Sequence, residues 1–469
     1  MISRIALSAL FTAFAISMAS AQTPPVTPPK AATLKDAENF YREKKISEAL
    51  EVLEALKAKD NELPPAKVTL SLWLYRDKEY QAARQFLEDA AAATPNHPEV
   101  LLLNASFAFG EGRLTDALQS CQTAEQAAAS KDWSATQRTR FLRDARMGAA
   151  AAYERRGNFP EVIRILTAIL NDDAKNGAVR VRRALAYFRA GGVGDRDKAL
   201  EELKIAYKDD EKTIDPPEIT MAALWTARTP GKDEKPKDAA EENYKQAKIF
   251  NEKATTIHPN NPKACRAYAS FLLDNGDPQT AKPYIDNAAK LDLARPEKAL
   301  TRETMSLEAL YYRHMKEYAK AEEKFEALRK MNENDGFAIA NLAIVLAELG
   351  ASAKPVDKAK LKRAIDLATA LVNSTKSAEA YAVLGWCCYL NGSLDDAEKF
   401  LAQAMKGQGQ IAFDTAYYIA KLLYDREKYE DAEKFLKDIV TARGPFVYRK
   451  EAMAFLPQIK QKIPAKKAP

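Results

Sequence analysis

The residues best suited to redox chemistry, metal binding or nucleophilic catalysis are four cysteines and three histidines, and they are scattered along the chain. Cys387 and Cys388 are adjacent, where a disulfide within one helix would strain the backbone. Cys121 and Cys265 lie far apart in the sequence. Zinc sites need cysteine and histidine at short, regular spacings, and no such spacing occurs. We therefore expect free thiols that are buried or partly buried, no metal site and no cofactor.

The acidic residues also lack the pattern of an active site. In residues 316–324, for example, Lys and Glu follow one another at helical spacing, which is typical of a solvated helix face. The sequence contains no glycine-rich phosphate loop, no nucleophile elbow and no His-Glu-x-x-His motif. It has no strand pattern that could carry a doubly wound sheet. We expect a protein that is not an enzyme.

A different regularity organises the chain: small residues recur in pairs twelve positions apart. The pairs are Ala37 and Ala49, Ser71 and Ala83, Ala105 and Ala117, Ala150 and Val162, Ala269 and Ala281, Ala309 and Ala321, Gly385 and Ala397, and Ala420 and Ala432. Two packed helices need a small residue on each at the point of closest approach, because a bulkier side chain costs about 1–3 kcal/mol there. The repeated interval predicts stacked helical hairpins.

The spacing between successive anchors, Ala49 to Ala83 and Ala83 to Ala117, is 34 residues. This period and its apolar positions resemble the tetratricopeptide repeat. One unit shows the family pattern in full, at Leu70, Ser71, Leu74, Tyr80, Ala83, Leu87, Ala90 and Pro95. Units anchored at Ala321 and Ala432 show much of it, and the resemblance extends throughout the chain. It implies an all-α, right-handed superhelical solenoid of helix-turn-helix units.

About eleven units are expected. Their anchors are Ala49, Ala83, Ala117, Val162, Ala199, Ala247, Ala281, Ala321, Ala364, Ala397 and Ala432. Apolar steps of three and four on both helices mark faces that only a neighbouring repeat can bury. Longer spacings before Val162, Ala247 and Ala364 predict extended helices or loops, such as residues 231–236 and 352–356. The solenoid is predicted to occupy residues 34–445 as one elongated domain.

The segments outside the solenoid predict an exported bacterial protein. Arg4 precedes an apolar run, residues 5–18, and Ala19-Ser20-Ala21 suits a signal peptidase, so we expect a signal peptide at 1–21 with cleavage after Ala21. The run has about 14 residues, too few to span a bilayer. A periplasmic or exported location without membrane insertion follows, and a retained anchor is the alternative. A Pro-rich linker (22–33), a capping helix (446–460) and a basic tail (461–469) complete the predicted organisation.

The family resemblance also implies a binding groove. In this family the first helices line a concave groove, and residues two, five, nine and twelve of each unit face it. These positions give two sets of peptide-binding candidates: Arg180, Arg183, Tyr187, Lys263 and Arg266, and Trp386, Tyr389, Tyr417, Lys421 and Tyr424. Guanidinium groups can hold carboxylates, and aromatic side chains anchor partners. Solvated arginines and aromatic core packing are the alternatives.

The favoured function is a non-catalytic protein–protein interaction scaffold of the bacterial cell envelope that binds a peptide or partner domain in this groove. Acidic segments are one class of partner that the arginines would suit. Nucleic acid is not expected as a partner, because 71 basic residues are nearly balanced by 65 acidic ones. The alternative is a structural component whose solenoids self-associate within an envelope, secretion or surface-appendage assembly. The sequence leaves the oligomeric state open.

Overall fold

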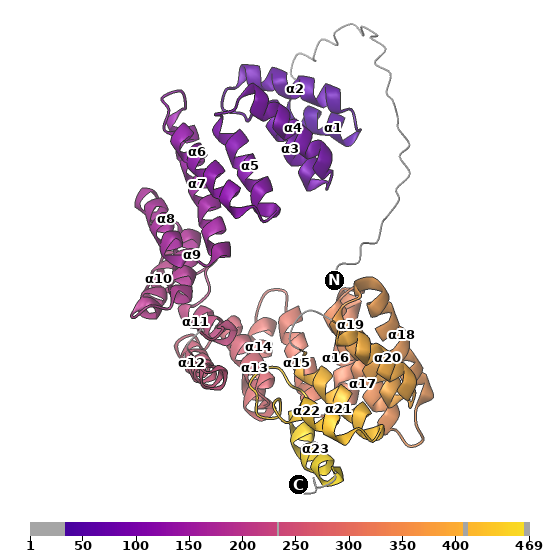
Figure 1. Cartoon of the computed structure of the whole chain (residues 1–469). Coiled ribbons are helices and arrows are strands. Elements are labelled where there is room, and N and C mark those ends of the chain that lie inside the picture. Colours follow the sequence, from indigo (N-terminus) through magenta and orange to yellow (C-terminus); the bar gives the residue numbers. More distant parts are fainter. Residues whose placement is uncertain (1–32, 232–233, 407–410, 464–469) are drawn as a thin grey trace, which may run out of the picture. The chain divides into compact units, whose positions relative to one another are not determined.

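The computed structural model describes residues 33–231, 234–406 and 411–463. The expected signal peptide, the linker up to residue 32 and the tail after residue 463 lie outside these residues. The described residues form 23 helices and no strand (Figure 1). None of these helices combines the length and the apolar character needed to cross a bilayer.

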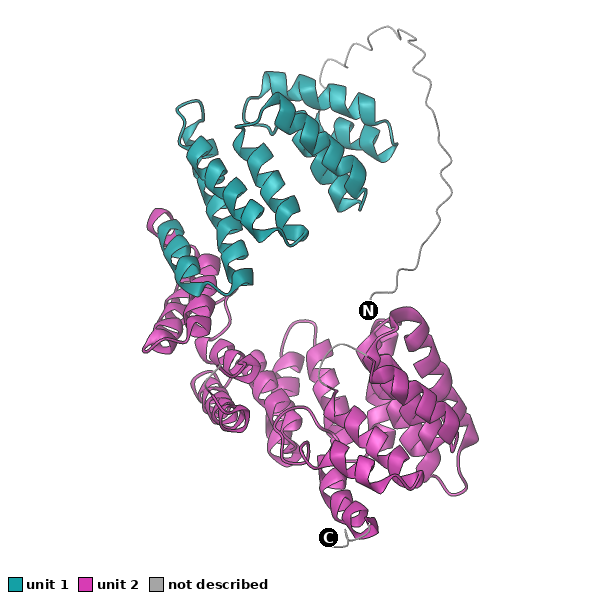
Figure 2. Ribbon diagram, viewed as in Figure 1, with its two compact units in different colours: residues 1–169 teal, residues 170–469 magenta. Residues whose placement is uncertain are grey.

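The chain divides into two compact units, residues 1–169 and 170–469 (Figure 2). The helices of unit 1 are α1 (Leu34–Arg42), α2 (Ile46–Lys59), α3 (Ala66–Arg76), α4 (Tyr80–Ala93), α5 (Pro98–Gly110), α6 (Leu114–Ala128) and α7 (Ala135–Arg156), and α8 (Phe159–Asp172) runs past its end. Those of unit 2 are α9 (Gly177–Ala190), α10 (Asp195–Asp209), α11 (Pro217–Ala227), α12 (Pro236–Ile257), α13 (Pro262–Asp274), α14 (Pro278–Leu293), α15 (Arg302–His314), α16 (Tyr318–Met331), α17 (Gly336–Ser352), α18 (Lys358–Thr375), α19 (Ala378–Leu390), α20 (Leu394–Ala404), α21 (Phe413–Asp425), α22 (Tyr429–Leu436) and α23 (Arg449–Lys462).

Most helices pack as hairpins, with an odd-numbered helix along the even-numbered one that follows it, as in α5 with α6 and α19 with α20. The eleven predicted anchors fall one on each even-numbered helix from α2 to α22. Each anchor side chain is at most 2% exposed. The prediction of an all-α repeat solenoid with about eleven units is confirmed.

Close contacts explain why small residues are needed at the paired positions. The Ser71 hydroxyl donates a hydrogen bond of 2.6 Å to the carbonyl of Ala83 across the hairpin of α3 and α4. At Gly385, a Cβ atom would lie 2.7 Å from Cγ of Leu401 and 3.2 Å from its backbone nitrogen. A larger side chain would therefore force α19 away from α20.

The turn inside each regular hairpin has a recurring backbone conformation. The residue five positions before the anchor adopts a positive φ, between 58° and 83°. The position holds glycine in four hairpins (Gly112, Gly157, Gly276, Gly392) and a charged residue in four others (Lys44, Lys78, Lys316, Glu427). Glycine takes this left-handed conformation without steric cost, whereas other residues pay about 1 kcal/mol. This turn reverses the chain in both units.

The irregular spacings correspond to longer helices. Helices α7 and α12 have 22 residues each, and α17 and α18 have 17 and 18. In the hairpin of α17 and α18, Gly350 is the point of close approach, because its Cβ would lie 3.0 Å from the carbonyl oxygen of Asp357. The last helix, α23, buries Ala452, Phe455 and Ile459, in the region where we expected a capping helix.

Candidate functional site

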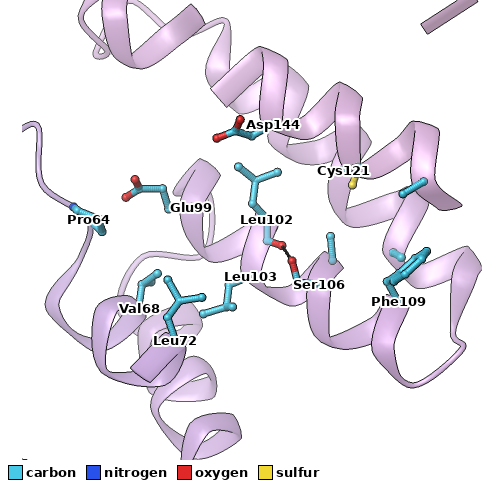
Figure 3. A pocket seen from close by; sticks show the side chains of 14 residues that line it. Pro64, Val68, Leu72, Glu99, Leu102, Leu103, Ser106, Phe109, Cys121 and Asp144 are labelled. Carbon is cyan, nitrogen blue, oxygen red and sulfur yellow. Dashed lines mark hydrogen bonds between the residues drawn. The ribbon is translucent and has the colours of Figure 1, made fainter. Parts of the chain in front are cut away.

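An open cavity lies in unit 1, on helices α3, α5, α6 and α7. Its volume is about 430 Å³. The side chains that line it include Val68 and Leu72 of α3, Glu99, Leu102, Ser106 and Phe109 of α5, Cys121 of α6, and Asp144 and Ala151 of α7. Figure 3 shows the carboxylates of Glu99 and Asp144 at one end of this pocket and Phe109 and Cys121 at the other.

The pocket coincides with the groove positions of three consecutive repeats. When Ser71, Ala105 and Ala150 are each taken as residue eight, positions five and nine of the first repeat are Val68 and Leu72. In the second repeat, positions two, five, nine and twelve are Glu99, Leu102, Ser106 and Phe109, and in the third, positions two and nine are Asp144 and Ala151. The sequence analysis missed these residues. The same positional rule would have identified them.

The pocket combines an apolar surface with an acidic end. Leu72 is 47% exposed, which is unusual for a leucine that lines a cavity. At the acidic end, Oε1 of Glu99 accepts a hydrogen bond of 2.6 Å from Arg140. Its other oxygen, Oε2, is buried and has no hydrogen-bond partner among the described residues. Burial raises the pKa of Glu99, while Arg140 opposes that shift.

The far end of the pocket rests on a tight contact between α6 and α7. A Cβ at Gly148 would lie 2.9 Å from the sulfur of Cys121. Burial raises the pKa of the Cys121 thiol to about 11, so the thiol is neutral at pH 7 and a poor nucleophile. All four cysteines are buried and free. Cys121 therefore contributes shape to the pocket rather than reactivity.

In unit 2, the predicted basic residues Arg180 and Arg183 are paired with an acidic residue of the next helix. They lie 3.3 Å and 2.7 Å from the carboxylate oxygens of Glu202 on α10, and all three side chains are at most 15% exposed. The ring of Tyr187 lies beneath Lys198, with 5.5 Å from the ammonium nitrogen to the ring centre. The two arginines thus share one carboxylate of the same chain.

The other basic candidates, Lys263 and Arg266, are paired as well. Lys263 lies 2.5 Å from Asp215, and Arg266 lies 3.2 Å from Asp292, whose side chain is fully buried. Thr301 and Thr304 donate hydrogen bonds of 2.6 Å to the same carboxylate. Burial acts to raise the pKa of Asp292, but these hydrogen bonds outweigh it and the pKa is lowered. A role for the basic set in holding a partner's carboxylates stays a prediction.

The predicted aromatic residues lie close together around the C-terminal part of the chain. Trp386 and Tyr417 are 3% and 7% exposed. The ring of Tyr417 stacks on Tyr448 with centres 5.0 Å apart. Lys421 and Tyr424 both contact the ring of Phe455, at 4.4 Å and 5.0 Å from its centre. Four of the five candidates thus pack against residues that follow α22.

The remaining candidate of this set, Tyr389, joins two neighbouring repeats. Its ring stacks on Trp386 at 5.0 Å, and its hydroxyl donates a hydrogen bond of 2.6 Å to Asp425 on α21. Burial and this carboxylate both raise the pKa of Tyr389. The aromatic set therefore has the core packing that was the alternative to ligand binding, and its role toward a separate partner stays a prediction.

Comparison with known proteins identifies the repeat. Residues 69–132, which cover most of α3 and all of α4, α5 and α6, match the family model described as the tetratricopeptide repeat. The chain thus contains tetratricopeptide repeats. Proteins of this family are generally non-catalytic scaffolds that bind protein or peptide partners. No curated protein matches this chain.

Several solved structures resemble the tetratricopeptide repeat protein at low sequence identity. Yeast Tom70 is 15% identical, with 92% of this chain and 95% of that chain covered and a TM-score of 0.35. The human IFIT1 dimer with m7Gppp-AAAA is 16% identical (77% and 81% covered, TM-score 0.40). PilW, a type IV pilus biogenesis factor, is 18% identical (49% and 93% covered, TM-score 0.33). Scores this low say nothing about what this protein binds.

Four polar residues of unit 2 make contacts between helices that the sequence analysis did not single out. Arg313, at groove position twelve of its repeat, lies 2.7 Å from Asn341 and 3.2 Å from Asp414. Glu348 of α17 accepts hydrogen bonds from the Trp386 indole at 3.1 Å and the Tyr448 hydroxyl at 2.7 Å. Burial raises the pKa of Glu348, and these two hydrogen bonds partly offset that effect.

The described residues contain no group of three or more histidine, cysteine, aspartate or glutamate side chains placed to hold a metal ion. His97 and His314 sit in places that keep them uncharged. The Nδ1 atom of His97 accepts a hydrogen bond from the backbone of Glu99 at the start of α5, and burial lowers its pKa to about 4. Burial lowers the pKa of His314 to about 3. Both imidazoles are neutral at pH 7.

Proposed function

We propose that this protein is a non-catalytic interaction scaffold that binds a partner peptide in the groove pocket of unit 1. The observation that carries the proposal is the pocket of about 430 Å³ at the groove positions of three consecutive repeats, with Leu72 left 47% exposed in its wall. A peptide's apolar side chain would remove this surface from water, at about 25 cal/mol per Å². Such pockets commonly hold the anchor residues of partners.

The charges around the pocket suggest the chemistry of the partner. Glu99 and Asp144 form the acidic end, and the side chain of Asp144 is 44% exposed and pairs with the neighbouring Arg143. A partner segment with an aliphatic or aromatic residue next to a lysine or arginine would satisfy both parts of this surface. This preference is opposite in charge to the acidic partner that the arginines of unit 2 had suggested.

The location that we propose is the bacterial periplasm or cell surface. It is supported by the pattern of residues 1–21, in which Arg4, an apolar run and Ala19-Ser20-Ala21 follow one another in the order of a secretory signal. Mass spectrometry of the protein from a periplasmic extract of its native host should find Gln22 at the N-terminus. Recovery of the intact Met1 form from the cytosol would contradict this location.

Photo-crosslinking tests the binding site. A benzophenone amino acid replaces Leu102 at the centre of the pocket, and the crosslinked partner segment is identified by mass spectrometry. A synthetic peptide of that sequence should bind the wild-type protein, and the variant Leu72→Glu should bind it at least tenfold more weakly, because a carboxylate then occupies the apolar wall.

The matched control is Leu34→Glu, which changes a leucine of similar exposure, 49%, on α1 away from the residues that line the pocket. This control should bind the peptide like the wild type. Equal affinity of the Leu72→Glu and wild-type proteins for the peptide would reject the pocket as the binding site. Circular dichroism should show the same helix content in all three proteins.

A further inference from the structure

The chain between α22 and α23 is unusually long for a connection in this protein. Helix α22 ends at Leu436 and α23 begins at Arg449, so 12 residues intervene. The turn between α1 and α2 takes only three residues, Glu43 to Lys45. We call residues 443–455, the end of this connection with the start of α23, the latch segment. Its residues run along the groove positions of unit 2.

The first residue of the latch segment reaches far back in the chain. Arg443 lies over the ring of Tyr244 at 3.9 Å and 3.3 Å from the carboxylate of Glu241, both on α12. A Cβ at Gly276, in the turn between α13 and α14, would lie 3.2 Å from the side chain of Arg449. In Figure 1 the loop before α23 runs beside α13 and α14, in agreement with these contacts.

The centre of the latch segment inserts two aromatic side chains. Phe446 is 1% exposed and packs against Phe413 of α21, with ring centres 5.9 Å apart. Tyr448 is 6% exposed, stacks on Tyr417 and lies 5.8 Å from Trp386, ring centre to ring centre. Offset or tilted aromatic pairs of this kind add about 0.5–1.5 kcal/mol each beyond area burial.

Hydrogen bonds fix the register of the latch segment. The backbone nitrogen of Val447 donates to Oδ1 of Asp414 at 2.9 Å, and the hydroxyl of Tyr448 donates to Oε1 of Glu348 at 2.7 Å. Arg313 lies 5.7 Å from the centre of the Tyr448 ring. Lys316 pairs with Glu451 at the edge. The groove thus binds the backbone amide of Val447, the hydroxyl of Tyr448 and the carboxylate of Glu451.

These contacts are those of a bound peptide rather than of a helix that only covers the last repeat. Arg313, Trp386, Tyr417, Lys421 and Tyr424 are groove positions, and each contacts Tyr448 or Phe455. Helix α23 packs against α22, as a covering helix would. The partners of the latch segment also come from α12, α15, α17, α19 and α21, whereas covering the last repeat would require contact with α21 and α22 alone.

We propose that the groove of unit 2 is a peptide-binding site, and that the latch segment is its resident and exchangeable ligand. The class of ligand is a peptide with two aromatic residues that are separated by one residue and followed by arginine, as in Phe446-Val447-Tyr448-Arg449. This proposal does not depend on the pocket of unit 1. Because a tethered ligand competes at an effective concentration in the millimolar range, a free peptide binds well only when the latch is weakened.

Two features make the latch exchangeable. Its ion pairs at the rim are exposed, 41% for Arg443 with 44% for Glu241 and 56% for Lys316 with 22% for Glu451, and pairs of this kind contribute little to stability. A cavity of about 400 Å³ remains between the latch segment and the turns at Gly276 and Lys316, so this side of the contact is incompletely packed.

The test uses the full chain and a fluorescein-labelled peptide of residues 441–456. Fluorescence polarisation compares the wild type with a latch-weakened variant, Arg443→Ala with Phe446→Ala. The variant should bind the peptide saturably and at least tenfold more tightly than the wild type. Adding Glu348→Gln to this variant should weaken binding several-fold. The same loss is expected for a peptide with Tyr448→Phe, because phenylalanine has no hydroxyl to donate to Glu348.

A latch-weakened variant that keeps its helix content but binds the peptide no better than the wild type overturns the proposal. Hydrogen exchange of the wild-type protein covers the case in which the variant does not fold. The amides of residues 444–449 should exchange through local opening, faster than those of α19 and α21. Exchange of both sets at one common rate would mean that the segment is a fixed part of the core, and would also overturn the proposal.

Discussion

The two units use the same groove positions for different purposes. At position nine of their repeats, unit 1 has Leu72 and Ser106, and unit 2 has Trp386 and Lys421. The small and aliphatic side chains of unit 1 leave a cavity of about 430 Å³. The large side chains of unit 2 instead build a surface that the chain's own latch segment covers, so that Trp386 is 3% exposed.

This difference shows that the solenoid backbone does not determine whether a groove is open. Both units place groove residues on the first helix of each hairpin. In both, the turn contains a residue in the left-handed backbone conformation at the same position before the anchor. What differs is the volume and polarity of a few side chains and the presence of a complementary segment. A groove lined by large aromatic residues is costly to leave in water, and unit 2 covers it with a segment of the same chain.

The sharpest contrast is expected when position nine is truncated in both units. Trp386→Ala should lower the free energy of unfolding by about 3–5 kcal/mol, because it removes a buried indole and leaves a cavity. Leu72→Ala should lower it by less than about 0.5 kcal/mol, because that side chain is largely in water. Urea unfolding followed by circular dichroism measures both. Similar losses for the two variants would contradict the distinction between an open and a filled groove.

Asp274, at the end of α13 in unit 2, should show a pH-dependent effect of intermediate size. Burial raises its pKa to about 6. The folded state therefore binds its proton more tightly than the unfolded state, and stability from this group is present below about pH 4 and lost as pH rises through about 6. Asp274→Asn should stabilise unit 2 by about 2–3 kcal/mol at pH 7.5 and have no effect at pH 4. A gain that persists at pH 4 would exclude this cause.

His97 in unit 1 should give the opposite dependence of stability on pH. Its pKa is lowered to about 4 by burial, so the unfolded state binds a proton more readily and stability is lost as pH falls from about 6.5 to about 4. His97→Asn keeps a side chain that can accept the hydrogen bond at the start of α5. Melting temperatures measured from pH 7 to pH 4 should fall less steeply for this variant than for the wild type. Parallel curves would show that His97 is not the group responsible.

The smallest effect should be shared by both units. Lys78 and Glu427 hold φ values of 67° and 59° in equivalent turns. Replacing either with glycine should stabilise the protein by about 0.5–1 kcal/mol, since the relief of backbone strain slightly exceeds the added entropy of the unfolded chain. Thermal unfolding of the two single variants measures the gain. A gain in one unit only would show that the turn is not equivalent in the two units.

The repeat architecture could be predicted because it is encoded locally. A small residue such as Ala83 must lie opposite Ser71 for two helices to approach, and this requirement repeats at a fixed interval that one sequence displays. The irregular units were located by the same logic, because α7, α12 and α17 lengthen where the interval lengthens. Contacts between neighbouring helices depend on few residues and short separations.

The occupants of the groove could not be predicted in the same way. Whether Arg180 is available depends on Glu202, a residue of the next helix that the groove positions do not include. The latch segment pairs Arg443 with Glu241 across roughly 200 positions, a contact that no local pattern records. The unit 1 pocket was within reach of the positional rule, but Val68, Leu72 and Leu102 carry neither charge nor aromatic rings and were passed over.

The length of the connection before α23 has a consequence for the order of events during synthesis. Repeats contact mainly their neighbours, so each hairpin can form as it leaves the ribosome. The latch segment lies close to the C-terminus and is therefore among the last residues to be synthesised. Until it has been made, Trp386, Tyr417 and Glu348 lack their contacts with Tyr448. Every copy of the protein therefore passes through an interval in which this groove is vacant. A chain that terminates before residue 443 would keep this groove vacant. Its aromatic surface would then remain exposed to chaperones and proteases.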